Sequence, residues 1–521
     1  MSNAQADPTV PELTPALRRF LYFTAAVTGA AILIIEILGA KILSPVFGTS
    51  HFVWTAQIAV TLMSLACGYY LGGRWVDQAI RPGRLYGAIL LAGIYLAGMI
   101  KAAEPISYLC LELRLAVGSL LASAALFFVP LSLLAMVGPY LIRVLTASVK
   151  TVGGNVGRLS AVSTLGSCLG TVLIGYVMIP FLRNSVTLLL VSAVLMLLAA
   201  AYFLVWGRTF QSRALSAASL LAGLAIGVAG VRGDAFRGAV TVELFRRNSN
   251  FGLLQVIQRT DAPYRAFVND NLTQNTYDVN TGQSLSTFSY ALRGLAEAYT
   301  TNLQDVLVIG MGVGIVPMEL ARTGARLDVV EINPAIIPLA EKYFGFDPAR
   351  MNLFIEDGRC FLNRARKQYD VVILDAFLGD SPPSHLMTRE AFAAVQRLLK
   401  PGGTLLVNSM ARFESGRDFF AASLAKTLLT SFATVRIHGA PGGNTFFVAT
   451  TRPSLAFLRQ PDLRTVHHRC AAETSAAFTT LWDTDPVHGI VLTDDYNPVD
   501  FHDALNREDL RRKLALAIKT L

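Results

Sequence analysis

The chain has 521 residues, of which 53% are hydrophobic and only 16% are charged. Because about 25% of the residues in soluble globular proteins are charged, this shortage indicates that part of the chain lies in a membrane. The net charge of +9 does not predict nucleic-acid binding, since many basic residues lie in short loops between apolar segments. Five scattered cysteines without a Cys-x-x-Cys pair predict neither a disulfide framework nor a zinc site.

The composition changes sharply at one point in the chain. Charged residues are sparse up to Val231, and from about Arg232 the sequence has the composition of a soluble domain. The polar start of the chain lacks the pattern of a cleavable signal peptide, so we expect the first apolar segment to remain as an anchor. The predicted divisions are a polar N-terminal segment at 1–19, a transmembrane helical domain at 20–231, a small β unit at 240–300, a Rossmann-like nucleoside-binding domain at 301–505 and a C-terminal helix at 506–521.

About seven segments of the first half are long and apolar enough to span a bilayer, which takes roughly 20 residues. Glu36 lies within the first of them, and an acid inside a span is a functional candidate that could also simply pair with a buried polar group. Gly166 and Gly170 are spaced to let two helices approach closely. The segments are Phe20–Leu43, Phe52–Leu71, one that begins at Leu85, Leu115–Val137, Leu159–Phe181, Val186–Trp206 and Ala214–Val231.

The second half begins with short strand-like stretches at 244–276, which predict a small β unit. A buried strand, a glycine-rich turn, a helix, a second strand and an acid then follow in the order typical of a dinucleotide or nucleoside site. Glycines allow close approach of the backbone to the ligand, and the acid accepts hydrogen bonds from the ribose hydroxyls. These features are the strand 305–309, Gly310, Gly312 and Gly314, a helix from about Pro317, the strand 327–330 and Glu331.

Two further predicted strands also end in acids. The strand 352–355 is followed by Asp357 and Gly358, and the strand 369–374 is followed by Asp375. Ligands of open parallel sheets bind beyond the carboxyl ends of the strands. The acids that follow the second, third and fourth strands should therefore converge on one site.

These motifs resemble the class I S-adenosylmethionine-dependent transferase fold and, more narrowly, the spermidine synthase (polyamine aminopropyltransferase) family. The resemblance covers about residues 244–500, where the β unit, the acids and the Asp-Gly pair follow the family's order. The membrane half is similar to the leader of bacterial spermidine-synthase-like fusion proteins, through Glu36-x-x-Gly39, residues 44–48 and Trp54. The expected fold is thus a multi-pass helical membrane domain, a small β unit and an α/β Rossmann-like domain.

The resemblance implies a role for each site residue. Glu331 would bind the ribose, and Asp357 the adenine amino group. Asp375 would act on the amine nucleophile, and Asp380 would hold it; a helix cap and a turn residue are the respective alternatives. The other implied ligand contacts are Gln255, Gln274, Gly310, Gly312, Gly314 and Gly358, with residues 494–498 closing the pocket.

The implied substrate is S-adenosylmethionine or its decarboxylated form, with no metal. Methylthioadenosine would be released by aminopropyl transfer to a small amine such as putrescine, and Asp375 would be the general base. His467 and His468 are adjacent and have no third ligand nearby, so we expect a surface pair and not a metal site.

Two departures from the family leave other functions open. Val313 stands where the family has an acid that binds the aminopropyl ammonium, and Ala291 follows Tyr290 where the family has histidine. Methyl transfer from intact S-adenosylmethionine, or its intramolecular cleavage, is therefore the second hypothesis. The third is a polyamine transporter or sensor, favoured by Glu36. NAD-linked oxidoreduction fits the glycine turn but not the β unit.

The expected location is the bacterial inner membrane. The basic loops at 72–84, 143–158 and 208–213 predict a cytoplasmic N-terminus, and seven spans would then place the second half outside. We nevertheless expect that half in the cytoplasm, where its nucleoside ligand is found, which requires one span more or one fewer. The oligomeric state is open, and a homodimer is compatible with the sequence.

Overall fold

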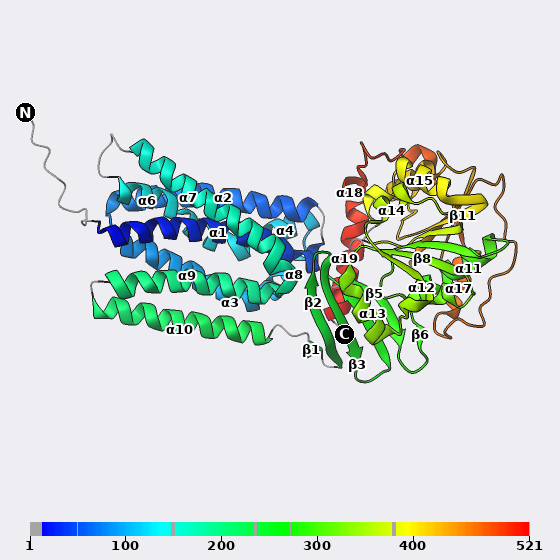
Figure 1. Cartoon of the computed structure of the whole chain (residues 1–521), viewed down its shortest axis with the longest axis horizontal. Helices are drawn as coiled ribbons and strands as arrows, with labels where there is room; N and C mark the ends of the chain where they lie inside the picture. Colours follow the sequence, from blue (N-terminus) through cyan, green and yellow to red (C-terminus); the bar gives the residue numbers. More distant parts are fainter. Residues whose placement is uncertain are drawn as a thin grey trace, which may run out of the picture. The chain divides into compact units, whose positions relative to one another are not determined.

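The computed structural model describes residues 13–48, 51–146, 152–207, 209–233, 237–238, 240–270, 272–377 and 382–519. The chain divides into two compact units, with the division between Phe236 and Arg237. The described part of the first unit is helical, and both β-sheets belong to the second unit (Figure 1).

The described part of the first unit contains seven helical segments that are long and apolar enough to cross a bilayer. The predicted apolar segments are therefore confirmed as long helices, while their insertion into a membrane remains a prediction. The fourth and fifth segments each contain a π-helical turn, at Ala124–Phe128 and Ile174–Met178. The bounds are α1 Pro15–Phe47, α2 His51–Gln78, α3 Pro82–Cys110, α4 Leu115–Ser123, α5 Val129–Ala135, α6 Val137–Leu145, α7 Val152–Leu173, α8 Ile179–Phe181, α9 Asn184–Trp206 and α10 Phe210–Gly233.

Helices α1 and α7 approach each other closely because α7 carries glycine at the contact. A Cβ atom on Gly166 would lie 2.1 Å from the carbonyl oxygen of Ala26, and one on Gly170 would lie 2.7 Å from that of Ala30. Any larger residue would push the helices apart. This is the packing role expected of a small-x-x-x-small pair.

A buried glutamine fills a similar gap between α1 and α2. The side chain of Gln57 lies against Gly39, where a Cβ atom would be 2.6 Å from the amide, and Gln57 Oε1 accepts a hydrogen bond of 2.7 Å from Ser123. Glu36 lies one turn before Gly39 on α1 and is partly exposed. Its role remains a prediction.

The second unit begins with an antiparallel sheet in the order β1-β2-β3-β4-β5-β6, which forms the small β unit. Asn250 and Phe251 form the turn between β2 and β3, and Asp270 lies in the turn after β4. A bulge between Phe267 and Val268 leaves Gln274 opposite no single partner. The strands are β1 Arg237–Gly238, β2 Thr241–Ser249, β3 Gly252–Arg259, β4 Tyr264–Asn269, β5 Leu272–Asp278 and β6 Gln283–Ser284.

The larger sheet has eight strands in the order β14-β12-β13-β11-β10-β7-β8-β9. Strands β9, β8, β7, β10 and β11 are parallel, and β13 is antiparallel to both β11 and β12. This mixed, doubly wound order is Rossmann-like, which confirms the expected fold class. The strands are β7 Asp305–Ile309, β8 Arg326–Glu331, β9 Asn352–Ile355, β10 Tyr369–Leu374, β11 Leu399–Ser409, β12 Thr434–Gly439, β13 Thr445–Thr450 and β14 Leu481–Trp482.

Helices cover both faces of this sheet, as parallel sheets require. Val306 and Val308 of β7 face one apolar core, which includes residues of α11, α12 and α13. Leu307 and Ile309 face the other core, with residues of α14, α15 and α16. The helices are α11 Thr287–Tyr299, α12 Ile315–Ala321, α13 Ile337–Phe344, α14 Gly358–Arg364, α15 Arg389–Leu398, α16 Phe419–Leu428, α17 Ala471–Thr479, α18 Val499–His502 and α19 Ala504–Lys519.

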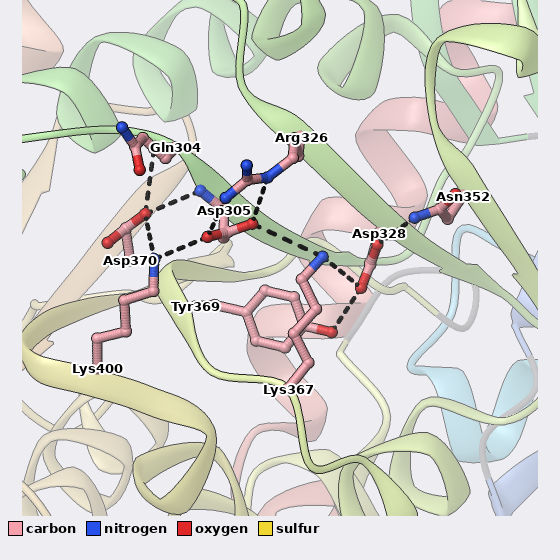
Figure 2. Close-up of polar contacts among 9 residues, drawn as sticks. All are labelled: Gln304, Asp305, Arg326, Asp328, Asn352, Lys367, Tyr369, Asp370 and Lys400. Atoms are coloured by element: carbon pink, nitrogen blue, oxygen red, sulfur yellow. Dashed lines mark hydrogen bonds and ion pairs between the residues drawn. The ribbon is translucent and has the colours of Figure 1, made fainter.

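The amino ends of the parallel strands carry a network of ion pairs (Figure 2). Asp305, which begins β7, accepts hydrogen bonds from Arg326 Nε at 2.9 Å and Lys400 Nζ at 2.8 Å. Lys400 also donates to Asp370 of β10 at 3.0 Å. The hydrogen bond from Arg326, although opposed by burial, holds the pKa of Asp305 well below its usual value. The network ties neighbouring strands together at the edge opposite to the acids Glu331 and Asp375.

The prediction of a surface histidine pair is wrong for His467. Only 2% of this residue is exposed, and its Nε2 lies 3.3 Å from Asp278 Oδ2. Its Nδ1 accepts the backbone N–H of Arg469, so the ring is held within a turn. A strand would have pointed His467 and His468 to opposite sides, whereas in this turn their rings lie 4.3 Å apart.

Candidate active site

The glycine turn joins β7 to α12 at the carboxyl edge of the large sheet. Gly310, Gly312 and Gly314 have φ values of +96°, +53° and +80°, a region that other residues rarely adopt. A Cβ atom on Gly310 would lie 2.3 Å from the carbonyl oxygen of Asp375. The turn therefore requires glycine for its conformation and also for the close approach of two strand ends.

Glu331 ends β8 and fastens the glycine turn. Its carboxylate accepts hydrogen bonds from the backbone N–H of Met311 at 3.0 Å and of Asn333 at 2.7 Å. Burial raises the pKa of Glu331, and the backbone N–H groups around it act in the opposite direction. The turn and the acid thus form one rigid unit, and the carboxylate keeps lone pairs for further donors.

Asp357 is the N-cap of α14. Its Oδ1 accepts the backbone N–H groups of Arg359 at 2.9 Å and Cys360 at 3.0 Å, and its Oδ2 lies 3.1 Å from His385 Nε2. Burial raises its pKa, but the N–H of Cys360 and the nearby His385 outweigh burial, so the pKa lies below its usual value. Asp357 is therefore an ionised acceptor. The adjacent Gly358 permits close packing, since a Cβ atom there would lie 2.5 Å from Ile309.

Asp375 follows β10 directly beside the glycine turn. Its backbone N–H donates to the carbonyl oxygen of Ile309 at 2.8 Å, and its Oδ1 accepts a hydrogen bond of 2.7 Å from Asn408 Nδ2. Burial raises the pKa of Asp375 to about 7, and the hydrogen bond from Asn408 acts against this rise. Asn408 Oδ1 in turn accepts from Asn444 at 2.9 Å. This amide relay was not predicted. Ligands of open parallel sheets bind beyond the carboxyl ends of the strands, and this rule could have identified Asn408, which lies near the carboxyl end of the fifth strand.

These contacts bring the glycine turn, Glu331, Gly358 and Asp375 together at the carboxyl edge of β7, β8 and β10. Asp357 joins them through Gly358, which packs on the last residue of β7. No group of three or more His, Cys, Asp or Glu residues within the described ranges could hold a metal ion. The arrangement offers backbone N–H groups and carboxylates to a ligand, and a carboxylate that can exchange a proton near neutral pH.

The two predicted glutamines have different surroundings. Gln255 donates to Glu243 Oε1 at 2.8 Å and points to the sheet face opposite to Leu254 and Val256, which belong to the core shared with the Rossmann-like domain. The structure therefore does not bring Gln255 together with the glycine turn. Gln274 lies at the bulge of β5, where side chains are commonly redirected.

Asn275, the residue after Gln274, was not singled out in the sequence. A Cβ atom on Gly312 would lie 3.3 Å from Asn275 Oδ1, so this buried amide borders the glycine turn. A polar residue next to a bulge is the signal that could have identified it.

The loop after β10 and the C-terminal part of the chain meet beside Asp357. Asp380 lies outside the described residues. Asp494 contacts Arg359 and Thr388, and Asn497 Nδ2 donates to the carbonyl oxygen of Ser384 at 3.0 Å. The segment predicted to close the pocket is thus attached to the loop that carries His385.

Both departures from the family are visible in the structure. Val313 is 1% exposed and belongs to the apolar core. Tyr290 is buried, and its hydroxyl donates to the carbonyl oxygen of Ser284 at 2.8 Å, while Ala291 packs in the core. Neither Val313 nor Ala291 can form an ion pair with a ligand.

Comparison with known proteins agrees with this geometry. Residues 287–436, which contain the glycine turn and all three acids, match the family model of the spermine/spermidine synthase domain. This segment is therefore similar to a spermidine synthase domain. The polyamine aminopropyltransferase of Vibrio vulnificus is 38% identical over 112 residues, which are 20% of this chain and 38% of that protein.

Two further proteins illustrate the range of proteins to which parts of this chain are similar. The N-terminal histidine N-methyltransferase of Emericella nidulans is 32% identical over 139 residues, 26% of this chain and 24% of that protein. The chain thus spans less than two fifths of the length of either curated relative. The solved structure of spermidine synthase from Thermotoga maritima overlaps 46% of this chain and 84% of its own, with 19% identity and a TM-score of 0.37.

Proposed function

We propose that the protein is a membrane-embedded, spermidine synthase-like enzyme that binds S-adenosylmethionine or its decarboxylated form and releases methylthioadenosine. The observation that carries the proposal is Asp375, a carboxylate beside the glycine turn whose pKa is raised to about 7 by burial. A group with this pKa can take a proton from an amine at neutral pH. The polyamine aminopropyltransferase named above supports aminopropyl transfer to a polyamine such as putrescine.

The transfer needs little covalent chemistry from the protein. The amine nitrogen forms a bond to the aminopropyl carbon while the carbon–sulfur bond breaks, and its electron pair goes to sulfur, giving neutral methylthioadenosine. The proton leaves the nitrogen for Asp375. The enzyme's contribution is to hold the two reactants in line and to keep the amine unprotonated.

The remaining site residues would bind the nucleoside. Glu331 would accept the ribose hydroxyls, Asp357 Oδ2 the adenine amino group, and the glycine turn would contact the ligand through its backbone. Gln274 and Asp380 would line the amine side. We further propose that the first unit spans the bacterial inner membrane and that the second unit works in the cytoplasm, where the nucleoside is supplied.

A second candidate is a reaction of intact S-adenosylmethionine, either methyl transfer or intramolecular cleavage. The buried Val313 favours it, because an acid at this place would repel the carboxylate of the intact molecule and none is present there. The histidine N-methyltransferase among the relatives supports methyl transfer as one form of it.

The test is to incubate the purified full chain in detergent with intact or decarboxylated S-adenosylmethionine, with and without putrescine, and to follow methylthioadenosine by chromatography. Asp375→Asn should abolish the product. Asp370→Asn, the same change at the other end of β10, is the matched control and should retain it. Product from the decarboxylated substrate plus amine supports aminopropyl transfer. Product from the intact substrate without amine would assign the enzyme to the cleavage class instead.

Absence of turnover with binding retained would contradict aminopropyl transfer and intramolecular cleavage. Methyl acceptors would then be tested next, followed by polyamine uptake into proteoliposomes, which addresses a transport or sensing role.

A further inference from the structure

Arg359 connects three segments that lie far apart in the sequence. It follows Asp357 on α14, and only 16% of its side chain is exposed. Its Nη1 donates to the carbonyl oxygen of His385 at 3.0 Å and to Thr388 Oγ1 at 3.0 Å, and its Nη2 donates to Asp494 Oδ2 at 2.6 Å. The guanidinium of Arg359 thus links the start of α14 to the loop after β10 and to the C-terminal segment.

Asp494 completes the connection from the other side. Its Oδ1 accepts the hydroxyl proton of Thr388 at 2.6 Å, and its backbone N–H donates to Glu390 Oε2 at 3.0 Å. Thr388 is only 1% exposed and caps α15 by accepting the N–H of Ala391. Both carboxylate oxygens of Asp494 are therefore bonded to groups that fix the position of the loop 384–388.

The loop 384–388 acts on Asp357. One oxygen of Asp357 is used by the cap of α14, which leaves Oδ2, and Oδ2 lies 3.1 Å from His385 Nε2. The backbone of His385 is held by Arg359, so only its side chain can move without breaking the network. The position of His385 thus decides how Asp357 Oδ2 is presented to a base.

We propose that Asp494 is a positioning residue of the nucleoside site: through Arg359 and Thr388 it holds His385 so that Asp357 Oδ2 accepts the amino group of adenine. The proposal rests on the proposed function, since it assumes a bound adenine nucleoside. Asp494 does not touch the base. It affects the affinity of the site for the nucleoside and the selectivity of the site for the 6-amino group. A hypoxanthine nucleoside, which has an oxygen at that position, is disfavoured by the same arrangement because two acceptors would face each other.

The experiment measures binding of methylthioadenosine and of methylthioinosine to the full chain in detergent by calorimetry. Asp494→Asn removes one charge-assisted acceptor, and we expect about tenfold weaker binding of methylthioadenosine with little change for methylthioinosine. Asp483→Asn is the matched control, because this exposed carboxylate lies outside the segment 494–498 and forms no hydrogen bond or ion pair with other described residues. Thr388→Val should weaken binding as Asp494→Asn does. Thr388→Ser keeps the hydroxyl and should bind methylthioadenosine like the wild type.

The outcomes separate this proposal from the proposed function. Selective loss of methylthioadenosine binding in Asp494→Asn, with an unchanged Tm, supports the positioning role. Equal binding by the wild type and Asp494→Asn overturns it and leaves the proposed function intact. Equal weakening of both nucleosides with a lowered Tm also overturns it, because it indicates a general structural role. A wild-type protein that binds neither methylthioadenosine nor S-adenosylmethionine overturns both proposals.

Discussion

Replacing Asn408 with leucine tests how Asn408 affects the pKa of Asp375, the proposed general base. Asn408 is 1% exposed and donates to Asp375 Oδ1 at 2.7 Å, which favours the ionised carboxylate. Leucine has a similar size and can neither donate nor accept, so the change removes the hydrogen bond to Asp375 and the one that Asn408 accepts from Asn444, and it leaves the acid in place. The pKa of Asp375 should rise above its value of about 7.

The size of the rise follows from the contact. A hydrogen bond to a charged group contributes about 1.5–3 kcal/mol, and one pKa unit corresponds to about 1.4 kcal/mol. The pKa of Asp375 should therefore increase by about 1–2 units in Asn408→Leu. A general base works only when it is ionised, so activity is lost as the pH falls through this pKa, and the rate at pH 7 should decrease roughly five- to fiftyfold.

The assay is kcat/KM for methylthioadenosine release, measured between about pH 5 and pH 9.5. The acidic limb of the profile should lie near pH 7 in the wild type and should move to higher pH in Asn408→Leu. Asn444→Leu is the control, because it disturbs the relay but keeps the direct donor to Asp375, and it should shift the limb less. Identical limbs in the wild type and Asn408→Leu would refute the assignment of Asp375 as the base.

Two further substitutions test the sheet edges. Gly310→Ala should abolish methylthioadenosine binding in calorimetry, because the new Cβ atom would lie 2.3 Å from the carbonyl oxygen of Asp375. Gly324→Ala is the control and should retain binding, since Gly324 has a similar φ of +81° but open space around it. Asp305→Asn should lower stability at pH 7 by about 2 kcal/mol, because it removes a buried carboxylate bonded to Lys400. Since the folded pKa of Asp305 lies below its usual value, its contribution is present above about pH 4 and is lost as the pH falls further. Thermal unfolding that shows the same deficit at pH 3 and pH 7 would contradict this.

The strands that carry the site could be predicted closely. The predicted strands 352–355 and 369–374 have the same bounds as β9 and β10, because each apolar stretch ends abruptly at an acid. The acids therefore mark the carboxyl edge of the sheet in the sequence itself. The positive φ values of the three turn glycines agree with the expected sharp turn after the first strand, which glycine permits.

The contacts between distant segments could not be predicted in this way. Arg359 and Asp494 are 135 positions apart, and no local pattern in the sequence pairs them. The burial of His467 depends on Asp278, which lies 189 positions earlier. The position of Asn408 near the carboxyl end of the fifth strand can be read from the sequence, but only the order of strands in the sheet places it beside Asp375. Such pairings depend on tertiary topology, which periodicity and turn chemistry do not contain.

We propose that the carboxyl edge of β7, β8 and β10 binds an adenosyl nucleoside. Calorimetric binding of methylthioadenosine to the full chain tests this proposal most directly. The wild type should bind, and Glu331→Gln should weaken binding at least tenfold, because the amide presents donors where the ribose hydroxyls and the N–H of Met311 need acceptors. Binding that is absent in the wild type, or unchanged in Glu331→Gln, would show that this edge of the sheet is not the proposed nucleoside site.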